Sequence, residues 1–308
     1  MTTLGIGLAL ALAQPGPSTV TAVAFRPDGR VVATAGWDET ISVYLVPEGR
    51  LLRTHRGHQE HITSLAYSPD GTTLISGSAD GRIGLWAGDR EHTIGFVRAG
   101  TDYVSGVGFH PNGREFYAAG YDNRIKAWSW PSSSGPRVAL QLDSDAYGMA
   151  VSSQGTLAGF GPVFDAGKTA FKWTETVARR VLPPVVIDED LTEGSFSADG
   201  QHLAAVSLSG AVYLISRDGK HRTIPVARPE DIAYVAAPSS GWVVATYEGW
   251  IHGLTLDGSS GDRWQVSGNP TAIAAHPSQP WAVFGTDQGG VTLIDLTTGE
   301  TTSFTRPR

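Results

Sequence analysis

Three of the nine histidines stand three residues apart, at His55, His58 and His61. Imidazole is a common metal ligand, and three such rings could hold a metal ion if they shared one face of an element. A spacing of three residues brings side chains to one face only on a helix. Because this segment has no helical pattern of apolar residues, we interpret the histidines as turn and surface residues, except for His58, to which we assign a structural role, and we predict no metal site and no cofactor.

Acidic side chains are the second group that could do chemistry. Asp28, Asp70 and Asp199 each stand one residue before a glycine in a turn-forming stretch. An aspartate in that place accepts hydrogen bonds from nearby amide groups, so we interpret these residues as turn residues rather than as general acids. The sequence contains no Gly-x-Ser-x-Gly, phosphate-loop or His-Glu-x-x-His motif, and it contains no cysteine that could act as a nucleophile. We therefore expect a protein that is not an enzyme.

The elements that must position these residues are short strands. The 308 residues include 38 Gly and 18 Pro, and only 17% of them are charged, which favours many short strands joined by tight turns. No stretch free of Gly and Pro places apolar residues at helical spacing, so we expect almost no helix. The formal net charge is −7 and no run of Lys and Arg occurs, which argues against a nucleic acid as the partner.

A repeat organises the chain. Turn-forming glycines recur every 41 to 45 residues, at Gly29, Gly71, Gly113, Gly155, Gly200 and Gly241. A seventh unit follows around residues 276–280. A period of this length, with four strand-like stretches in each unit, is typical of a β-propeller. We expect a single domain over residues 1–308, with the seven repeats in residues 14–301.

Both ends of the chain offer a strand that could complete the last repeat. Residues 4–13 are apolar, and residue 12 lies as far before residue 20 as residue 54 lies before residue 62. We therefore expect residues 1–13 to form the closing outer strand of the last blade, and residues 302–308 to be a tail or an extra edge strand. The alternative is a secretory signal peptide, although no basic residue precedes the apolar stretch. The first interpretation predicts a cytoplasmic protein and the second an exported one.

The second unit is the most regular. It runs from Gly57 and His58 through an apolar stretch to Ser-Pro-Asp-Gly at residues 68–71, and then through a second strand and a turn at Asp80 to a strand that ends in Trp86. This order resembles one repeat of the WD40 family. The resemblance extends over nearly the whole chain. It implies an all-β fold, a seven-bladed WD40-like β-propeller with four-stranded antiparallel blades.

The resemblance also implies a buried hydrogen-bond relay in the second unit, formed by His58, Ser76, Asp80 and Trp86. The other units depart from this pattern. The first has Tyr44 in place of the tryptophan, and the third has Asp122 and Trp128 without a histidine. The Trp-Asp pair that gives the family its name is absent from the strand ends, where Trp86 is followed by Ala87.

In a WD40 propeller the loop that enters each blade and the turn between its second and third strands share one face, the top face. The resemblance places aromatic side chains at several of these positions and acidic side chains ahead of units four, five and six. Both kinds of side chain attract cations, so we expect this face to bind a partner protein or peptide that carries basic residues. The candidate residues are Trp37, His61, Tyr103, Tyr121, Asp145, Asp190, Asp231 and Tyr247.

We thus expect a non-catalytic scaffold for protein–protein interaction, monomeric by itself or a subunit of a complex, with neither a nucleic acid nor a membrane as its partner. The alternative is a propeller enzyme, or a metabolite- or metal-binding protein, that uses acidic residues around the central channel. This alternative depends on the acidic stretches ahead of units four, five and six, which also include Asp143, Asp188, Glu189 and Glu230.

Overall fold

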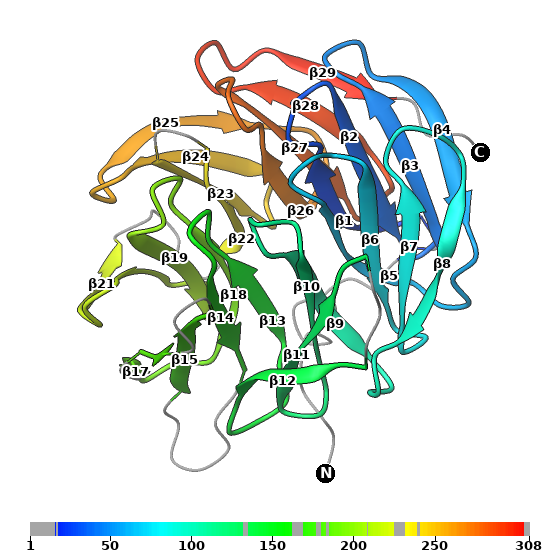
Figure 1. The fold of residues 1–308 in the computed structure, drawn as a ribbon. Coiled ribbons are helices and arrows are strands. Elements are labelled where there is room, and N and C mark those ends of the chain that lie inside the picture. The colour runs from blue at the N-terminus through cyan, green and yellow to red at the C-terminus, as the bar shows by residue number, and fades with distance from the viewer. Residues whose placement is uncertain are drawn as a thin grey trace.

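The computed structural model describes residues 16, 18–131, 135–161, 169–176, 180–182, 185–207, 209–224, 232–238 and 241–304. In these ranges all regular secondary structure is β-strand, arranged in seven antiparallel sheets. The sheets follow one another around a common centre, with the first strand of each sheet innermost (Figure 1). The prediction of an all-β, seven-bladed propeller is confirmed. No helix of the described part of the chain is long and apolar enough to cross a membrane.

Blades 1 to 3 each contain four strands that are consecutive in sequence. Blade 1 contains β1 (Val20–Phe25), β2 (Val31–Gly36), β3 (Thr40–Leu45) and β4 (Arg50–Arg56). Blade 2 contains β5 (Ile62–Tyr67), β6 (Thr73–Ser78), β7 (Arg82–Ala87) and β8 (Thr93–Arg98). Blade 3 contains β9 (Val104–Phe109), β10 (Glu115–Gly120), β11 (Arg124–Ser129) and β12 (Arg137–Gln141).

Blade 4 has a divided outer strand. It contains β13 (Gly148–Val151), β14 (Thr156–Phe160) and β15 (Thr169–Glu175), and both β16 (Arg180–Val181) and β17 (Val185–Ile187) pair with β15. Blade 5 contains β18 (Leu191–Phe196), β19 (His202–Ser207), β20 (Val212–Ser216) and β21 (His221–Ile224). Blade 6 contains β22 (Ile232–Ala236), β23 (Gly241–Thr246), β24 (Trp250–Thr255) and β25 (Ser260–Gln265). Blade 7 contains β26 (Pro270–Ala275), β27 (Trp281–Thr286), β28 (Val291–Asp295) and β29 (Thr301–Phe304).

The repeated glycines have a backbone cause. Five of them close the turn between the first two strands with φ between 67° and 81°, a region that other residues disfavour: Gly29, Gly71, Gly113, Gly155 and Gly200. Gly241 differs, because it is the first residue of β23 and has no positive φ. A Cβ atom there would lie 2.0 Å from the carbonyl oxygen of Leu254, so close backbone approach explains this glycine.

The core lies between neighbouring blades. Trp86 of blade 2, for example, belongs to one buried cluster with Ile41 and Val43 of blade 1. Hydroxyl groups join the innermost strands as well. Near the start of β5, Thr63 donates to the carbonyl of Val104 in the next blade over 2.5 Å. Near the start of β26, Thr271 donates to the carbonyl of Val20 in blade 1 over 2.6 Å. Thr21 and Ser105 make the equivalent bonds to the next blade.

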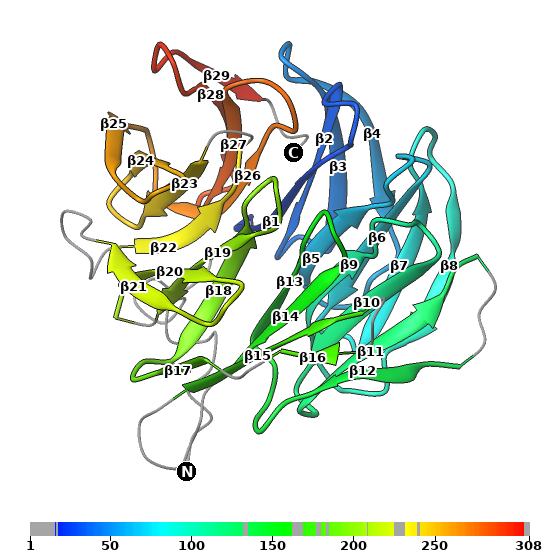
Figure 2. The same ribbon diagram turned by 60° about the vertical axis from the view of Figure 1, so that its left-hand side comes forward.

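The ring closes in a way that differs from our expectation. The outer position of blade 7 belongs to β29, which pairs with β28 from Val291 opposite Phe304 to Ile294 opposite Thr301. The last blade lies beside the first in both views (Figures 1 and 2). Residues 301–304 are therefore the fourth strand, and not a tail or an extra edge strand. Residues 1–13, which we expected in that position, lie outside the described residues.

The physical reason is local. A short turn after β28 returns the chain directly beside it, and such short connections are favoured over distant pairing. Phe304 then anchors the strand, because it is only 5% exposed and its ring centroid lies 5.5 Å from that of Tyr44 in blade 1. Our expectation for residues 1–13 was based on the spacing between residues 12 and 20, and that spacing does not report the contact between Phe304 and Tyr44.

Candidate functional site

Four of the predicted site residues lie in a continuous row on the top face. The Trp37 ring stacks on His61 with centroids 4.3 Å apart and planes 2° apart. His61 meets Tyr103 edge to face at 5.9 Å, and Tyr103 stacks on Tyr121 at 4.6 Å. Tyr147 adjoins Tyr121 at 6.0 Å. We call these five residues the aromatic arc.

The arc extends over blades 1 to 4, and its rings come from the turn after the second strand or from the entry to the first strand. Trp37 and Tyr121 begin the turns that follow β2 and β10, whereas His61, Tyr103 and Tyr147 directly precede β5, β9 and β13. Backbone hydrogen bonds fix these places. The N–H of Trp37 donates to Thr19 over 3.0 Å, and the carbonyl of His61 accepts from the N–H of Ala79 over 3.1 Å.

The exposed part of the arc is uncharged at neutral pH. Burial lowers the pKa of His61 and raises that of Tyr103 to about 12. The pKa of Tyr121 is also raised, by burial and by neighbouring tyrosines and Asp145. Trp37, His61, Tyr103 and Tyr121 are each partly exposed. The arc therefore presents neutral π-faces to solvent.

One end of the arc is acidic. Burial and the negative charge of Asp122 raise the pKa of Asp145. Burial raises the pKa of Tyr147, and the charges of Asp190 and Asp145 raise it further. Asp145 and Asp190 thus lie near the same tyrosine, and a cation bound there would favour the ionised form of Asp145.

Two other predicted acidic residues are held by neighbours instead. Asp143 accepts a hydrogen bond from Lys172 over 2.6 Å, and Glu189 accepts from the hydroxyls of Ser207 and Ser209. Asp231 and Glu230 lie outside the described residues. Tyr247 does not join the arc, because its described ring neighbour is Tyr234 of blade 6, at 6.2 Å.

Sequence reasoning missed Tyr147, which is 4% exposed and meets the Tyr121 ring edge to face. A signal for it exists in the repeat. The equivalent position holds a small hydroxyl residue in five other blades, at Thr21, Thr63, Ser105, Thr192 and Thr271. A tyrosine in that place cannot be explained by the hydroxyl contact between blades alone.

The relay of blade 2 links four side chains beneath the arc. The Trp86 Nε1–H donates to Ser76 Oγ over 2.9 Å, and Ser76 Oγ lies 2.7 Å from His58 Nε2. His58 Nδ1 lies 2.9 Å from Asp80 Oδ2. These contacts specify one proton arrangement, in which Ser76 donates to Nε2 and Nδ1–H donates to the carboxylate.

Electrostatics agrees with that arrangement. Burial outweighs the attraction of Asp80 and lowers the pKa of His58, so the ring is neutral. Although burial acts to raise the pKa of Asp80, hydrogen bonds from Arg82, from the N–H of Gln59 and from His58 lower it to about 2. The relay is thus a neutral histidine beside an ionised, multiply bonded carboxylate.

Comparisons with known proteins bear on this architecture. The family model for the "WD domain, G-beta repeat" matches residues 12–44, 49–87 and 92–129, which cover blades 1 to 3. The first three blades are therefore WD40 repeats, within a propeller of seven blades. Among solved structures, it is similar to Kuenenia stuttgartiensis hydrazine synthase, with a TM-score of 0.82 and 16% identity over 92% of this chain and 97% of that chain.

This propeller is also similar to the β-propeller domain of Cps50 (Swd1) from Myceliophteria thermophila. The TM-score is 0.76, with 16% identity over 90% of this chain and 96% of that chain. At such low identity, both likenesses concern the fold alone. No curated protein matches the chain in sequence.

The later blades of this propeller replace the relay with simpler contacts. In blade 5 the carboxylate comes from the entering loop, as Glu189, and the turn supplies Ser209 as the donor. In blade 7 Asn269 Nδ2 donates to Asp287 Oδ2 over 3.0 Å. Each contact ties the loop that enters the blade to the turn between its second and third strands, so it positions the top face.

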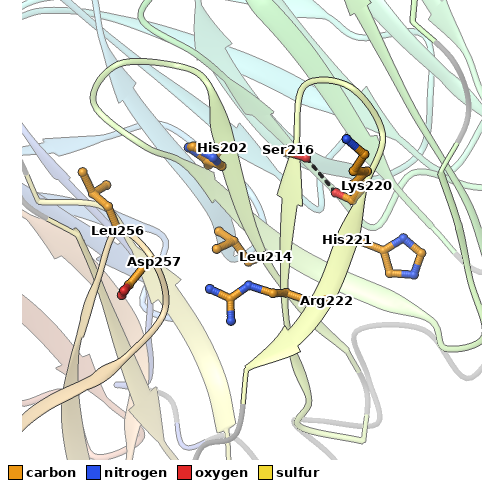
Figure 3. Close-up of a pocket in the computed structure, with 8 residues that line it drawn as sticks. All are labelled: His202, Leu214, Ser216, Lys220, His221, Arg222, Leu256 and Asp257. Carbon is orange, nitrogen blue, oxygen red and sulfur yellow. Dashed lines mark hydrogen bonds between the residues drawn. The ribbon is translucent and has the colours of Figure 1, made fainter.

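A separate hollow of about 450 Å³ lies at blades 5 and 6, near the ends of β19, β20 and β24. Figure 3 shows the Arg222 guanidinium lying toward Leu214 and Asp257, with the His221 ring turned away. Hydrogen bonds from Thr255 and Ser259 lower the pKa of Asp257 to about 2, and Lys220 on the rim pairs with Asp218. Among the described residues, no group of three or more His, Asp or Glu side chains could hold a metal ion.

Proposed function

We propose that this protein is a non-catalytic scaffold that binds a partner protein or peptide on its top face. The aromatic arc provides the contact surface, and a basic residue of the partner faces Asp145 and Asp190. The observation that carries the proposal is the continuity of the arc, in which successive ring centroids lie 4.3 to 6.0 Å apart across four blades.

The chemistry of the arc suits protein recognition. Rigid aromatic side chains dominate binding energy at protein interfaces because they offer large contact areas and lose little conformational entropy. Cations are attracted both to π-faces and to carboxylates, and Asp145 already has a raised pKa beside Asp122. WD40 propellers typically act as interaction scaffolds, and the seven blades give this one a rigid base.

The test is a selection of short random peptides displayed against the wild-type protein. Selected peptides should be rich in Arg or Lys. Their Kd should rise at least about tenfold, or about 1.4 kcal/mol, on Tyr103→Ala and on Asp190→Lys. Melting curves of both variants will show whether each one is folded.

Matched controls lie away from the top face. Glu91→Lys makes the same kind of charge reversal beside β8, and Leu256→Ala removes an exposed apolar side chain in the turn after β24. Both controls should retain the wild-type Kd. Peptides that bind all four variants equally would place the binding surface elsewhere, and peptides without basic residues would remove the acidic part of the proposal.

A further inference from the structure

Blades 5 and 6 break a pattern that the other innermost strands keep. At the position where the pairing with the second strand becomes regular, five blades carry a very small residue: Ala22, Ser64, Gly106, Gly148 and Ala272. The same position holds Glu193 in blade 5 and Tyr234 in blade 6. Two large polar side chains therefore stand at one level of adjacent innermost strands, at a position where the other five blades carry small residues.

Glu193 lacks the partners that a buried carboxylate normally has. Within the described residues no hydrogen bond or ion pair reaches it, and burial alone raises its pKa to about 8. The residue is nevertheless partly exposed. Burial without a partner destabilises the ionised form of a carboxyl, and a cation bound beside the carboxylate offsets this destabilisation.

Two tyrosines complete the surroundings of Glu193. Tyr234 and Tyr247 meet edge to face, with centroids 6.2 Å apart and planes at 75°. Burial raises the pKa of Tyr247 to about 12, and the charge of Glu193 adds to the shift of both tyrosines. Tyr247 stands in the turn after β23 on the top face, and both rings are partly exposed. Two partly exposed aromatic rings thus lie near Glu193.

We propose that Glu193, Tyr234 and Tyr247 form a binding site for an organic cation, either a guanidinium or a primary ammonium group. The carboxylate supplies the counter-charge and the tyrosines supply π-faces, a combination that suits such cations. The cation can belong to a free small molecule or to an Arg or Lys side chain of a bound segment. The site lies at blades 5 and 6, whereas the arc spans blades 1 to 4, so it is distinct from the arc, although Asp190 directly precedes β18 of blade 5.

Proton linkage gives this site a distinctive signature. At pH 7 a carboxyl with a pKa near 8 is mostly protonated, whereas a bound cation requires it ionised. Binding at pH 7 should therefore release close to one proton. A surface carboxylate with an ordinary pKa is already ionised at this pH and would release none.

The experiment is calorimetric titration at pH 7 in buffers of different ionisation enthalpy. The probes are methylguanidinium and methylammonium, a blocked Gly-Arg-Gly peptide, and its citrulline analogue as a neutral control. We expect proton release with the cationic probes and none with the citrulline peptide. Similar affinity for methylguanidinium and for the arginine peptide indicates a free cation as the ligand, and tighter binding of the peptide indicates a side chain of a bound segment.

Variants make the assignment specific. Glu193→Gln should abolish proton release and weaken binding at least about tenfold, and Tyr247→Ala should weaken binding while keeping the release. Glu189→Gln is the matched control, because Glu189 is bonded by Ser207 and Ser209 and its pKa is lowered. Binding that releases no proton, or release that persists in Glu193→Gln, overturns the proposal, as does the absence of binding by every cationic probe. Tyr103→Ala should change none of these results, so failure here is distinguishable from failure of the arc.

Discussion

Replacement of Asp80 by alanine tests how much the relay of blade 2 stabilises the fold. The Asp80 carboxylate is 4% exposed, and it accepts from His58 Nδ1 over 2.9 Å and from the Gln59 N–H over 3.0 Å. It also accepts from the backbone N–H of Arg82 over 2.9 Å and from its guanidinium over 2.7 Å. Gln59 and Arg82 reach solvent and can bond water instead, but the side chain of His58 is fully buried.

The expected loss follows from these contacts. A buried donor left without a partner costs about 1–3 kcal/mol, and each lost bond near the surface costs about 0.5–1 kcal/mol, so Asp80→Ala should destabilise by about 3 kcal/mol. Asp287→Ala is the control, because the side chain of Asp287 accepts one described hydrogen bond, from the exposed Asn269. It should cost at most about 1 kcal/mol. At roughly 2 °C per kcal/mol for a chain of this size, the melting temperature should fall by about 6 °C for Asp80→Ala and by at most about 2 °C for the control.

Acidity provides a second measurement of the same group. The pKa of Asp80 is about 2 in the fold, against 3.8 in the unfolded chain, so the unfolded state binds the proton first as the pH falls. The lowered pKa of Asp80 therefore corresponds to about 2 kcal/mol of folding stability. This stabilisation is fully present above pH 4 and is lost as the pH falls toward 2. The stability difference between wild type and Asp80→Asn should shrink over that window. Equal melting temperatures for Asp80→Ala and Asp287→Ala at pH 7 would refute the account of the relay.

Three further predictions address the hydrogen bond between blades 7 and 1, the closing strand β29 and the buried carboxyl of Glu193. Thr271→Val should lower stability by about 1 kcal/mol, because it removes the hydrogen bond from blade 7 to blade 1. Thr192→Val should cost less, because the Thr192 hydroxyl bonds within its own blade at 3.3 Å. Equal unfolding midpoints for the two variants would show that the bond between blades adds no stability. Phe304→Ala should cost about 3 kcal/mol and Thr302→Ala almost nothing, because only Phe304 is buried; similar thermal unfolding of the two would deny β29 its anchoring role. Glu193→Gln should stabilise the protein by about 4 kcal/mol at pH 8 and by little near pH 4.5, because the raised folded pKa makes wild-type stability fall by about 1.4 kcal/mol per pH unit as the pH rises between about 4.5 and 8. A wild-type stability that is flat over this range in urea titrations would contradict the shift.

Local chemistry explains what the sequence could predict. A turn that needs positive φ selects glycine wherever it recurs, so Gly29, Gly71 and their equivalents revealed the period and the blade count. The stacked positions of Trp37, His61, Tyr103 and Tyr121 follow from the same regularity, because equivalent places in successive blades are neighbours in space. Their binding role stays a prediction.

The individual partners of side chains could not be predicted in this way. Asp143 looked available for a ligand until Lys172, far along the chain, was seen to pair with it. Tyr247 has the same place in its turn as Trp37, yet Tyr234 draws it into a different contact. The closing strand depends on Phe304 meeting Tyr44 across the ring, and no spacing within one repeat reports that contact.

Departures from the repeat indicate function more strongly than its regular features do. Five equivalent positions hold Ala, Ser or Gly, which shows that the fold requires nothing larger there, yet Glu193 brings a carboxyl whose burial raises its pKa to about 8. Tyr147 likewise replaces a hydroxyl residue that joins neighbouring blades elsewhere, and the structure gives it a place under the arc. A residue that costs stability at a position where a small one suffices needs a compensating role. In a repeat protein each blade is thus the internal control for the others, and here that comparison singles out the top-face side of blades 4 to 6.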